Sequence, residues 1–185
     1  QLKFIPQSIE DVILIEPTIH GDDRGYFVET FRQDLFENFL GYEVDFIQDN
    51  ESKSSKGVLR GLHYQLPPFS QAKLVRVTEG SVMDVVVDIR KSSSTFGQFV
   101  AVHLTEENKK QLFVPHGFAH GFIVLSDKAT FMYKVDNHYS EKHERGIIYS
   151  DKELNIDWII SPDKMHVSGK DQIQPTLATS TDLSE

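Results

Sequence analysis

Short runs of β-branched and aromatic residues, separated by turns rich in Gly, Pro and Asp, recur between residues 12 and 135. Runs of this length and composition are typical of strands. Only residues 32–40 show apolar side chains at helical spacing, so no long helices separate the strands as they would in a parallel sheet. We therefore expect an all-β fold, a double-sheet jelly-roll sandwich or barrel with a few short helices. The predicted strands are residues 12–15, 26–31, 58–65, 74–78, 81–90, 99–104, 111–114, 119–125 and 130–135.

The strand predicted at residues 81–90 carries an acidic residue on an otherwise apolar face. Side chains alternate across a strand, so Val82, Asp84 and Val86 lie on the same side. A carboxylate between two valines indicates a lined cavity between sheets. The alternative is an exposed Asp on a twisted strand.

The composition of the chain excludes several classes of function. There are 28 acidic residues against 19 basic ones, a net charge of −9, which argues against binding to nucleic acid. The chain has no cysteine, which excludes disulfides, zinc-thiolate sites, iron–sulfur clusters and a thiol nucleophile. No apolar run is long enough to span a membrane, and the opening segment has no secretion signal. We expect a cytoplasmic protein with one domain, residues 1–175, and a loose polar tail, residues 176–185.

Histidines are candidate proton carriers near neutral pH. Residues 115–120 read PxGxxH and resemble the second motif of the cupin superfamily. The first motif of metal-binding cupins supplies HxH and a Glu, but the corresponding residues 61–65 contain only His63. A metal needs at least three good nitrogen or oxygen ligands, so we expect no metal.

Basic side chains could form a local anion site despite the negative net charge. Arg24 lies in a tight turn, and Arg60 precedes His63 by three residues. Lys73 and Arg76 share a predicted strand but point to opposite faces. Arginine suits bidentate phosphate binding, although each of these residues could instead be a solvated surface charge.

The most specific patterns are five longer segments: GDDRGYFVETF (21–31), FIQDNESKSSKGVLRGLHYQ (46–65), KLVRVTEGSVMDVVVDIRKSSSTFG (73–97), FVPHGFAHGF (113–122) and SGKDQIQPTL (168–177). With them the chain resembles the dTDP-4-dehydrorhamnose 3,5-epimerase family from about residue 3 to residue 177. The resemblance implies a metal-free cupin jelly roll that works as a homodimer without a cofactor. The implied reaction inverts C3 and C5 of dTDP-4-keto-6-deoxy-D-glucose and gives dTDP-4-keto-L-rhamnose, in dTDP-L-rhamnose biosynthesis.

The resemblance also implies roles for individual residues. His63 would be the general base, Asp171 its partner, Tyr133 the acid on the other face of the sugar, and Lys73 the group near the keto oxygen. Part of each site can come from the neighbouring protomer in dimers of this kind. The implied substrate-binding residues are Arg24, Phe27, Glu29, Gln48, Asp49, Asn50, Arg60, His120, Glu144 and Lys170.

The chemistry of a ketone agrees with these roles. A hydrogen next to the C4 ketone is acidic because the carbanion delocalises into an enolate. A histidine can remove this proton near pH 7, and a tyrosine phenol, which is protonated there, can return one from the opposite face. An ammonium group beside the oxygen would stabilise the negative charge that develops on it. Arg24, Arg60 and Lys170 are the candidates for binding the diphosphate.

Several other functions remain open at this level. The chain could invert only C3 or only C5, could act on another nucleotide sugar, or could be a sugar-nucleotide 3,4-ketoisomerase with the same histidine base. It could also be a metal-dependent cupin oxygenase or a cupin that binds a sugar nucleotide without catalysis. A further hypothesis pairs Asp84 with His120 at the floor of the pocket; the alternative is that His120 only fills a loop.

Overall fold

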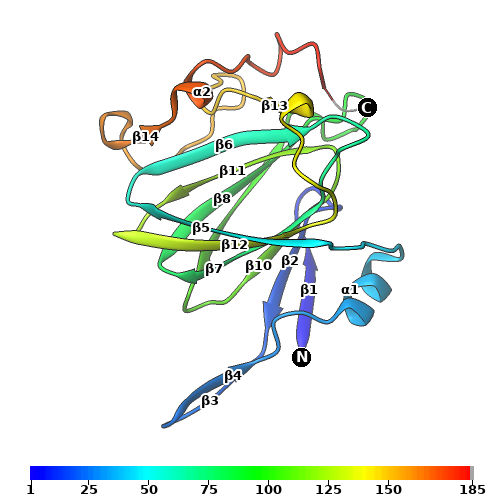
Figure 1. Ribbon diagram of the computed structural model, residues 1–185, viewed down its shortest axis with the longest axis vertical. Coiled ribbons are helices and arrows are strands. Elements are labelled where there is room, and N and C mark those ends of the chain that lie inside the picture. The colour runs from blue at the N-terminus through cyan, green and yellow to red at the C-terminus, as the bar shows by residue number, and fades with distance from the viewer. Residues whose placement is uncertain (184–185) are drawn as a thin grey trace.

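The computed structural model describes residues 1–183, which fold into two mainly antiparallel sheets packed face to face (Figure 1). The first sheet has the strand order β1-β2-β10-β7-β12-β5, and the second has the order β13-β6-β11-β8-β9. This sandwich confirms the expected jelly-roll class. The strands are β1 Leu2–Pro6, β2 Ile13–Pro17, β3 Ile19–Asp22, β4 Gly25–Val28, β5 Gln48–Ser55, β6 Val58–Gln65, β7 Lys73–Glu79, β8 Ser81–Asp88, β9 Phe99–Thr105, β10 Gln111–Val114, β11 Phe118–Val124, β12 Lys128–Val135, β13 Glu144–Gly146 and β14 His166–Val167.

The main core lies between the two sheets, because the apolar faces of their strands meet there. Val75 and Phe131 from the first sheet pack with Val86 and Phe122 from the second. The helix α1, Gln33–Leu40, agrees with the helical spacing in the sequence and packs its buried Phe36 in a separate cluster with residues of β2, β7 and β10. The other helical elements are short: η1 Glu141–His143, η2 Pro162–Lys164 and α2 Gly169–Gln172.

The strand β5 was not predicted, because its sequence, QDNESKSS, contains no apolar residue. It forms at the edge of the first sheet by pairing with β12, from Gln48 opposite Val135 to Ser55 opposite Lys128. Its alternate side chains are partly buried or buried, so one polar face of β5 lines the space between the sheets.

A β-bulge displaces the pairing of β6 and β11 next to His120. The backbones approach closely at this point: a Cβ atom on Gly61 would lie 2.6 Å from the Cα atom of Gly121, and Gly61 has a φ of +135°. Only glycine fits there. In a regular strand, Arg60 and His63 would point to opposite faces, but with this bulge both line the same cavity.

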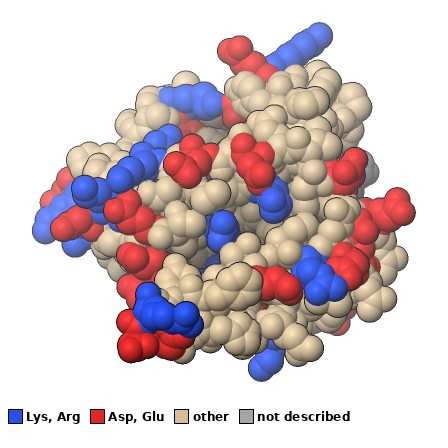
Figure 2. All heavy atoms as spheres, turned by 60° about the horizontal axis from the view of Figure 1, so that its bottom comes forward, with Lys and Arg blue, Asp and Glu red and all other residues tan. Residues whose placement is uncertain are grey.

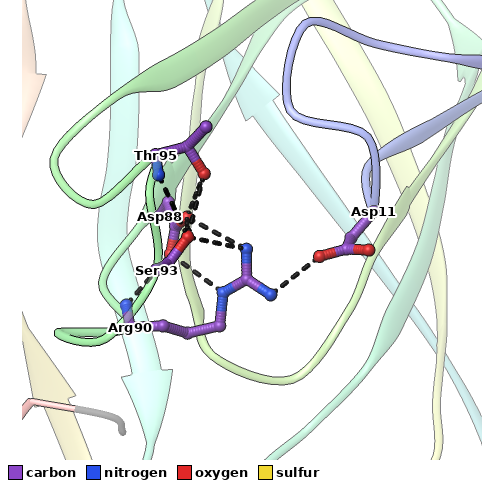
Figure 3. A network of polar contacts seen from close by, with 5 residues as sticks. All are labelled: Asp11, Asp88, Arg90, Ser93 and Thr95. Atoms are coloured by element: carbon purple, nitrogen blue, oxygen red, sulfur yellow. Dashed lines mark hydrogen bonds and ion pairs between the residues drawn. The ribbon is translucent and has the colours of Figure 1, made fainter.

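A polar network closes the sandwich at the end of β8 (Figure 3). Asp88 is fully buried and accepts hydrogen bonds from Arg90, Ser93 and Thr95, and the Arg90 guanidinium also reaches Asp11 at 2.7 Å. Burial alone would raise the pKa of Asp88, but these donors lower it to about 2. The carboxylate therefore anchors the loop after β8 to the body.

The chain after residue 175 lies against the domain where we expected a loose tail. The Leu177 amide donates to Asp151, the Tyr64 hydroxyl donates to the Asp182 carbonyl at 2.6 Å, and Arg145 pairs with the Asp182 carboxylate. The last two residues of the expected tail, 184 and 185, lie outside the described residues. Within residues 1–183, no helix has both the length and the apolar character needed to cross a bilayer.

Candidate active site

A cavity of about 390 Å³ lies between the two sheets, beside the edge strand β5. Side chains from β5, β7 and β12 form one wall, and those from β6 and β11 form the other; the segment around α2 adds a rim. The cavity brings together seven of the residues singled out in the sequence: Arg60, His63, Lys73, His120, Tyr133, Lys170 and Asp171.

His63 and Asp171 form a close pair although 108 residues separate them in the chain. The His63 Nε2 atom lies 2.6 Å from Asp171 Oδ1, and the second Asp171 oxygen accepts the Gly61 amide at 3.2 Å. Asp171 is buried, which would raise its pKa, but the hydrogen bond and charge of His63 outweigh burial and lower the pKa. Asp171 thus holds the ring of His63 in place.

Lys73 and Tyr133 face His63 from the other sheet. Lys73 is the first residue of β7, Tyr133 lies on β12, and the Lys73 Nζ atom is 5.7 Å from the centre of the Tyr133 ring. Burial lowers the pKa of Lys73 to about 8, although the negative charges of Asp84 and Glu144 oppose this shift. A cation and a phenol therefore stand on one wall and an imidazole on the other.

His120 and Asp84 form the second pair that the sequence suggested. The His120 Nε2 atom lies 2.7 Å from Asp84 Oδ1; Asp84 is fully buried and His120 is 6% exposed. The imidazole of His120 also stacks on the ring of Phe131. Asp84 is therefore buried behind His120, which lines the cavity, and is not exposed on a twisted strand.

The rim of the cavity carries groups that suit an anion. Arg60 is exposed, and its guanidinium donates a hydrogen bond to the Ser54 hydroxyl oxygen at 3.0 Å. Lys170 forms an ion pair with Glu144. The Tyr139 hydroxyl donates to the same Glu144 carboxylate at 3.2 Å, and its ring is 57% exposed.

Sequence reasoning missed some of the residues at this site. Ser52, His166 and Ser168 also line the cavity, and Tyr139 lies beside it through Glu144. Ser168 accepts the Asp171 amide at the start of α2, and the capping pattern SGKD was a signal for it. The polar sequence of β5 and the isolated position of His166 offered no comparable signal.

Besides Glu144, which pairs with Lys170 at the rim, six predicted binding residues lie outside the cavity. Arg24 and Phe27 belong to the β3–β4 hairpin, which projects away from the sandwich in Figure 1, and Glu29 follows it. The Arg24 side chain is 87% exposed and pairs with Asp22. The other three, Gln48, Asp49 and Asn50, begin β5; Gln48 donates to Asn50, and Asp49 pairs with Lys134.

Within residues 1–183, no group of three or more His, Cys, Asp or Glu side chains is placed to hold a metal ion. On the face shown in Figure 2, acidic and basic side chains are interspersed, and no broad basic surface of the kind used to bind nucleic acid is visible. Positive charge is instead concentrated locally, where Arg60, Lys73 and Lys170 converge on the cavity.

Comparison with known proteins gives consistent matches. Residues 6–179 match the family model described as dTDP-4-dehydrorhamnose 3,5-epimerase. The chain is 59% identical to the dTDP-4-dehydrorhamnose 3,5-epimerase of Shigella flexneri over 157 residues, which cover 85% of this chain and 87% of the relative.

Two solved structures are informative. The dTDP-6-deoxy-D-glucose-3,5-epimerase of Legionella pneumophila, in complex with dTDP-4-keto-L-rhamnose, has a TM-score of 0.95 and 45% identity, and the match covers 100% of this chain and 98% of that one. A 3′-monoepimerase from Streptomyces bikiniensis, in complex with dTDP-quinovose, has a TM-score of 0.86 and 37% identity, with 94% and 87% covered.

Proposed function

The chain belongs to the dTDP-4-dehydrorhamnose 3,5-epimerase family and is an isomerase, and we propose that its cavity inverts both C3 and C5 of dTDP-4-keto-6-deoxy-D-glucose. The C4 ketone acidifies the hydrogens on both neighbouring carbons. Inversion then requires one group to remove a proton from one face of the sugar and a second group to return a proton to the other face.

His63 is the base of this proposal. The observation that carries it is the 2.6 Å contact with buried Asp171, since a base must hold its proton after removing it from carbon. The Asp171 carboxylate orients the imidazole and stabilises the imidazolium that forms, which is the function of a carboxylate behind a catalytic histidine.

Tyr133 is the proposed acid, because it projects from the sheet opposite to His63. A sugar ring between the sheets would expose one face to the imidazole and the other to the phenol. The Lys73 ammonium beside Tyr133 would bind the C4 oxygen and stabilise the enolate; one such donor is worth roughly 10²–10³-fold in rate.

The rim is the proposed site for the nucleotide. Arg60 and Lys170 supply positive charge for the diphosphate, with His166 and Ser168 as further donors. The exposed ring of Tyr139 lies next to Glu144 and Lys170 and offers a flat apolar face on which the nucleobase could stack.

A homodimer would give the remaining predicted residues a function. The β3–β4 hairpin exposes Tyr26 and Phe27 by 62% and 71%, which is unusual for aromatic rings on a projecting element. We propose that the hairpin docks on a second copy of the chain and carries Arg24 and Phe27 to the partner's cavity.

The dimer proposal is tested by mixing two inactive variants, Arg24→Ala and His63→Ala, after joint refolding. A mixed dimer would contain one site with both residues intact, so activity should reappear in the mixture. No recovery, in a sample shown by sedimentation to contain mixed dimers, would mean that each hairpin serves its own protomer.

Solvent exchange tests the proposed reaction directly. The protein is incubated with dTDP-4-keto-6-deoxyglucose in D₂O, and deuterium at C3 and C5 is followed by NMR, with His63→Ala as the control. We expect incorporation at both carbons and an inverted product that a reductase can trap. Deuterium at one carbon would instead indicate a mono-epimerase, like the Streptomyces bikiniensis relative, or a ketoisomerase; no deuterium at either carbon would overturn the proposal.

A further inference from the structure

Asp84 has an unusual environment for a buried carboxylate. It lies on β8 with no exposed surface, and its Oδ1 atom is occupied by His120 at 2.7 Å. Among residues 1–183, its Oδ2 atom is the only buried side-chain nitrogen or oxygen that lacks a hydrogen-bond partner. A buried oxygen without a hydrogen-bond partner lowers the stability of the fold, so a functional reason for its position is expected.

Lys73 is a cation whose charge acts on Asp84. Its side chain lines the same cavity, and within the described part of the chain its ammonium has no hydrogen bond and no ion pair. The groups that act on it from the neighbouring elements are Asp84 on β8 and Glu144 on β13, both negative. His120 on β11, His63 on β6 and Tyr133 on β12 complete the surroundings.

Glu144 already has a partner, because it pairs with Lys170 and accepts the Tyr139 hydroxyl. His120 adds no positive charge, since burial lowers its pKa and favours the neutral ring. A neutral His120 satisfies Asp84 Oδ1 by donating its Nε2 hydrogen. Burial raises the pKa of Asp84, and the charge and hydrogen bond of His120 and the charge of Lys73 oppose this shift. Since His120 is neutral, Lys73 is the cation that favours the ionised form of Asp84.

We propose that Asp84 is a positioning residue that acts through Lys73: its buried carboxylate keeps the lysine ammonium charged and oriented toward the substrate oxygen. This inference rests on the proposed function, in which Lys73 must be protonated to stabilise the enolate. The depressed pKa of Lys73, about 8, fits a lysine held in a cavity where only part of the burial effect is offset.

The first test is the variant Asp84→Asn, which keeps the shape of the side chain and removes its charge. We expect the alkaline limb of the kcat profile to move down by about one pH unit, with KM for the substrate little changed. The matched control is Asp88→Asn, since Asp88 is equally buried on the same strand but pairs with Arg90. The control should lose stability and keep the alkaline limb of the wild type.

Two further variants keep the inference falsifiable if Asp84→Asn folds poorly. In Lys73→Arg the guanidinium stays charged, so the alkaline limb should disappear; its persistence would refute Lys73 as the titrating group. In a Lys73→Met background, Asp84→Thr should cause no additional loss of kcat. If Asp84→Thr lowered kcat by the same factor in the wild-type and the Lys73→Met backgrounds, Asp84 would act independently of Lys73.

A titration without turnover separates this inference from the proposed reaction. The lysines are labelled by ¹³C-methylation, and the Lys73 resonance is identified by its absence in Lys73→Arg. Its pKa should fall in Asp84→Asn and stay constant in Asp88→Asn. If the wild type fails to exchange deuterium but this pKa falls, the proposed function is wrong and the counter-ion inference stands; an unchanged pKa overturns the inference.

Discussion

Replacing Asp88 by asparagine should destabilise the protein, because the carboxylate is the centre of the network at the end of β8 (Figure 3). Asp88 is fully buried and accepts hydrogen bonds from Arg90, Ser93 and Thr95. An asparagine of the same shape could keep one acceptor but would remove the charge that binds the guanidinium. The substitution would therefore weaken the contact that Arg90 makes between the loop after β8 and the segment around Asp11.

The size of the effect follows from the pKa of Asp88, which falls from 3.8 to about 2 on folding. That difference corresponds to about 2 kcal/mol of stability at neutral pH. Since the folded pKa is the lower one, this contribution is fully present above pH 4 and is lost as the pH falls through about 2. For a chain of this length, it amounts to a decrease of about 4–8 °C in Tm.

Thermal and urea unfolding at pH 7, at one fixed protein concentration, would measure this loss. The control is Asp11→Asn, which removes the other partner of Arg90; Asp11 is 55% exposed, so its ion pair should contribute much less, at most about 1 kcal/mol. If Asp88→Asn melted within a degree of the wild type, or if both variants lost the same amount, the network would not be the anchor described here.

Three further predictions concern the reaction. His63→Ala should lose about 10²–10⁴-fold in turnover while still binding dTDP, as measured by kinetics and calorimetry, and near-normal turnover would exclude His63 as the base. Tyr133→Phe should slow the return of protons more than their removal, so the ratio of deuterium washout to product formation should be higher than in the wild type. Full-rate inversion of both centres would exclude Tyr133 as the acid. Dialysis against a chelator should leave the rate unchanged, because the cavity of residues 1–183 offers no metal-ligand cluster, and a loss restored by a divalent metal would contradict this.

Much of the fold could be predicted from local patterns. The alternation in β8 placed Asp84 on the same face as Val82 and Val86, and all three are buried. The helical spacing around Phe36 located α1. These predictions hold because the spacing of apolar side chains reports the period of an element and therefore which side chains share a face.

Some of the elements that escaped prediction lack such periodicity. The strand β5 has a wholly polar sequence, and its pairing with β12 comes from backbone hydrogen bonds that any residue except proline can make. The weak strand β14, two residues long, forms only because β6 offers a free partner. No local pattern distinguishes such segments from loops.

The sequence by itself determined the class of fold, the absence of thiol chemistry, and, through resemblance, the residues to examine. Only the tertiary structure decided which of them meet. His63 reaches Asp171 across 108 residues, and Arg60 joins His63 in one cavity because β6 bulges at Gly61. The physical reason is that periodicity along a chain encodes burial locally, whereas contacts between distant side chains depend on strand order, register and bulges, which arise from the packing of the whole chain.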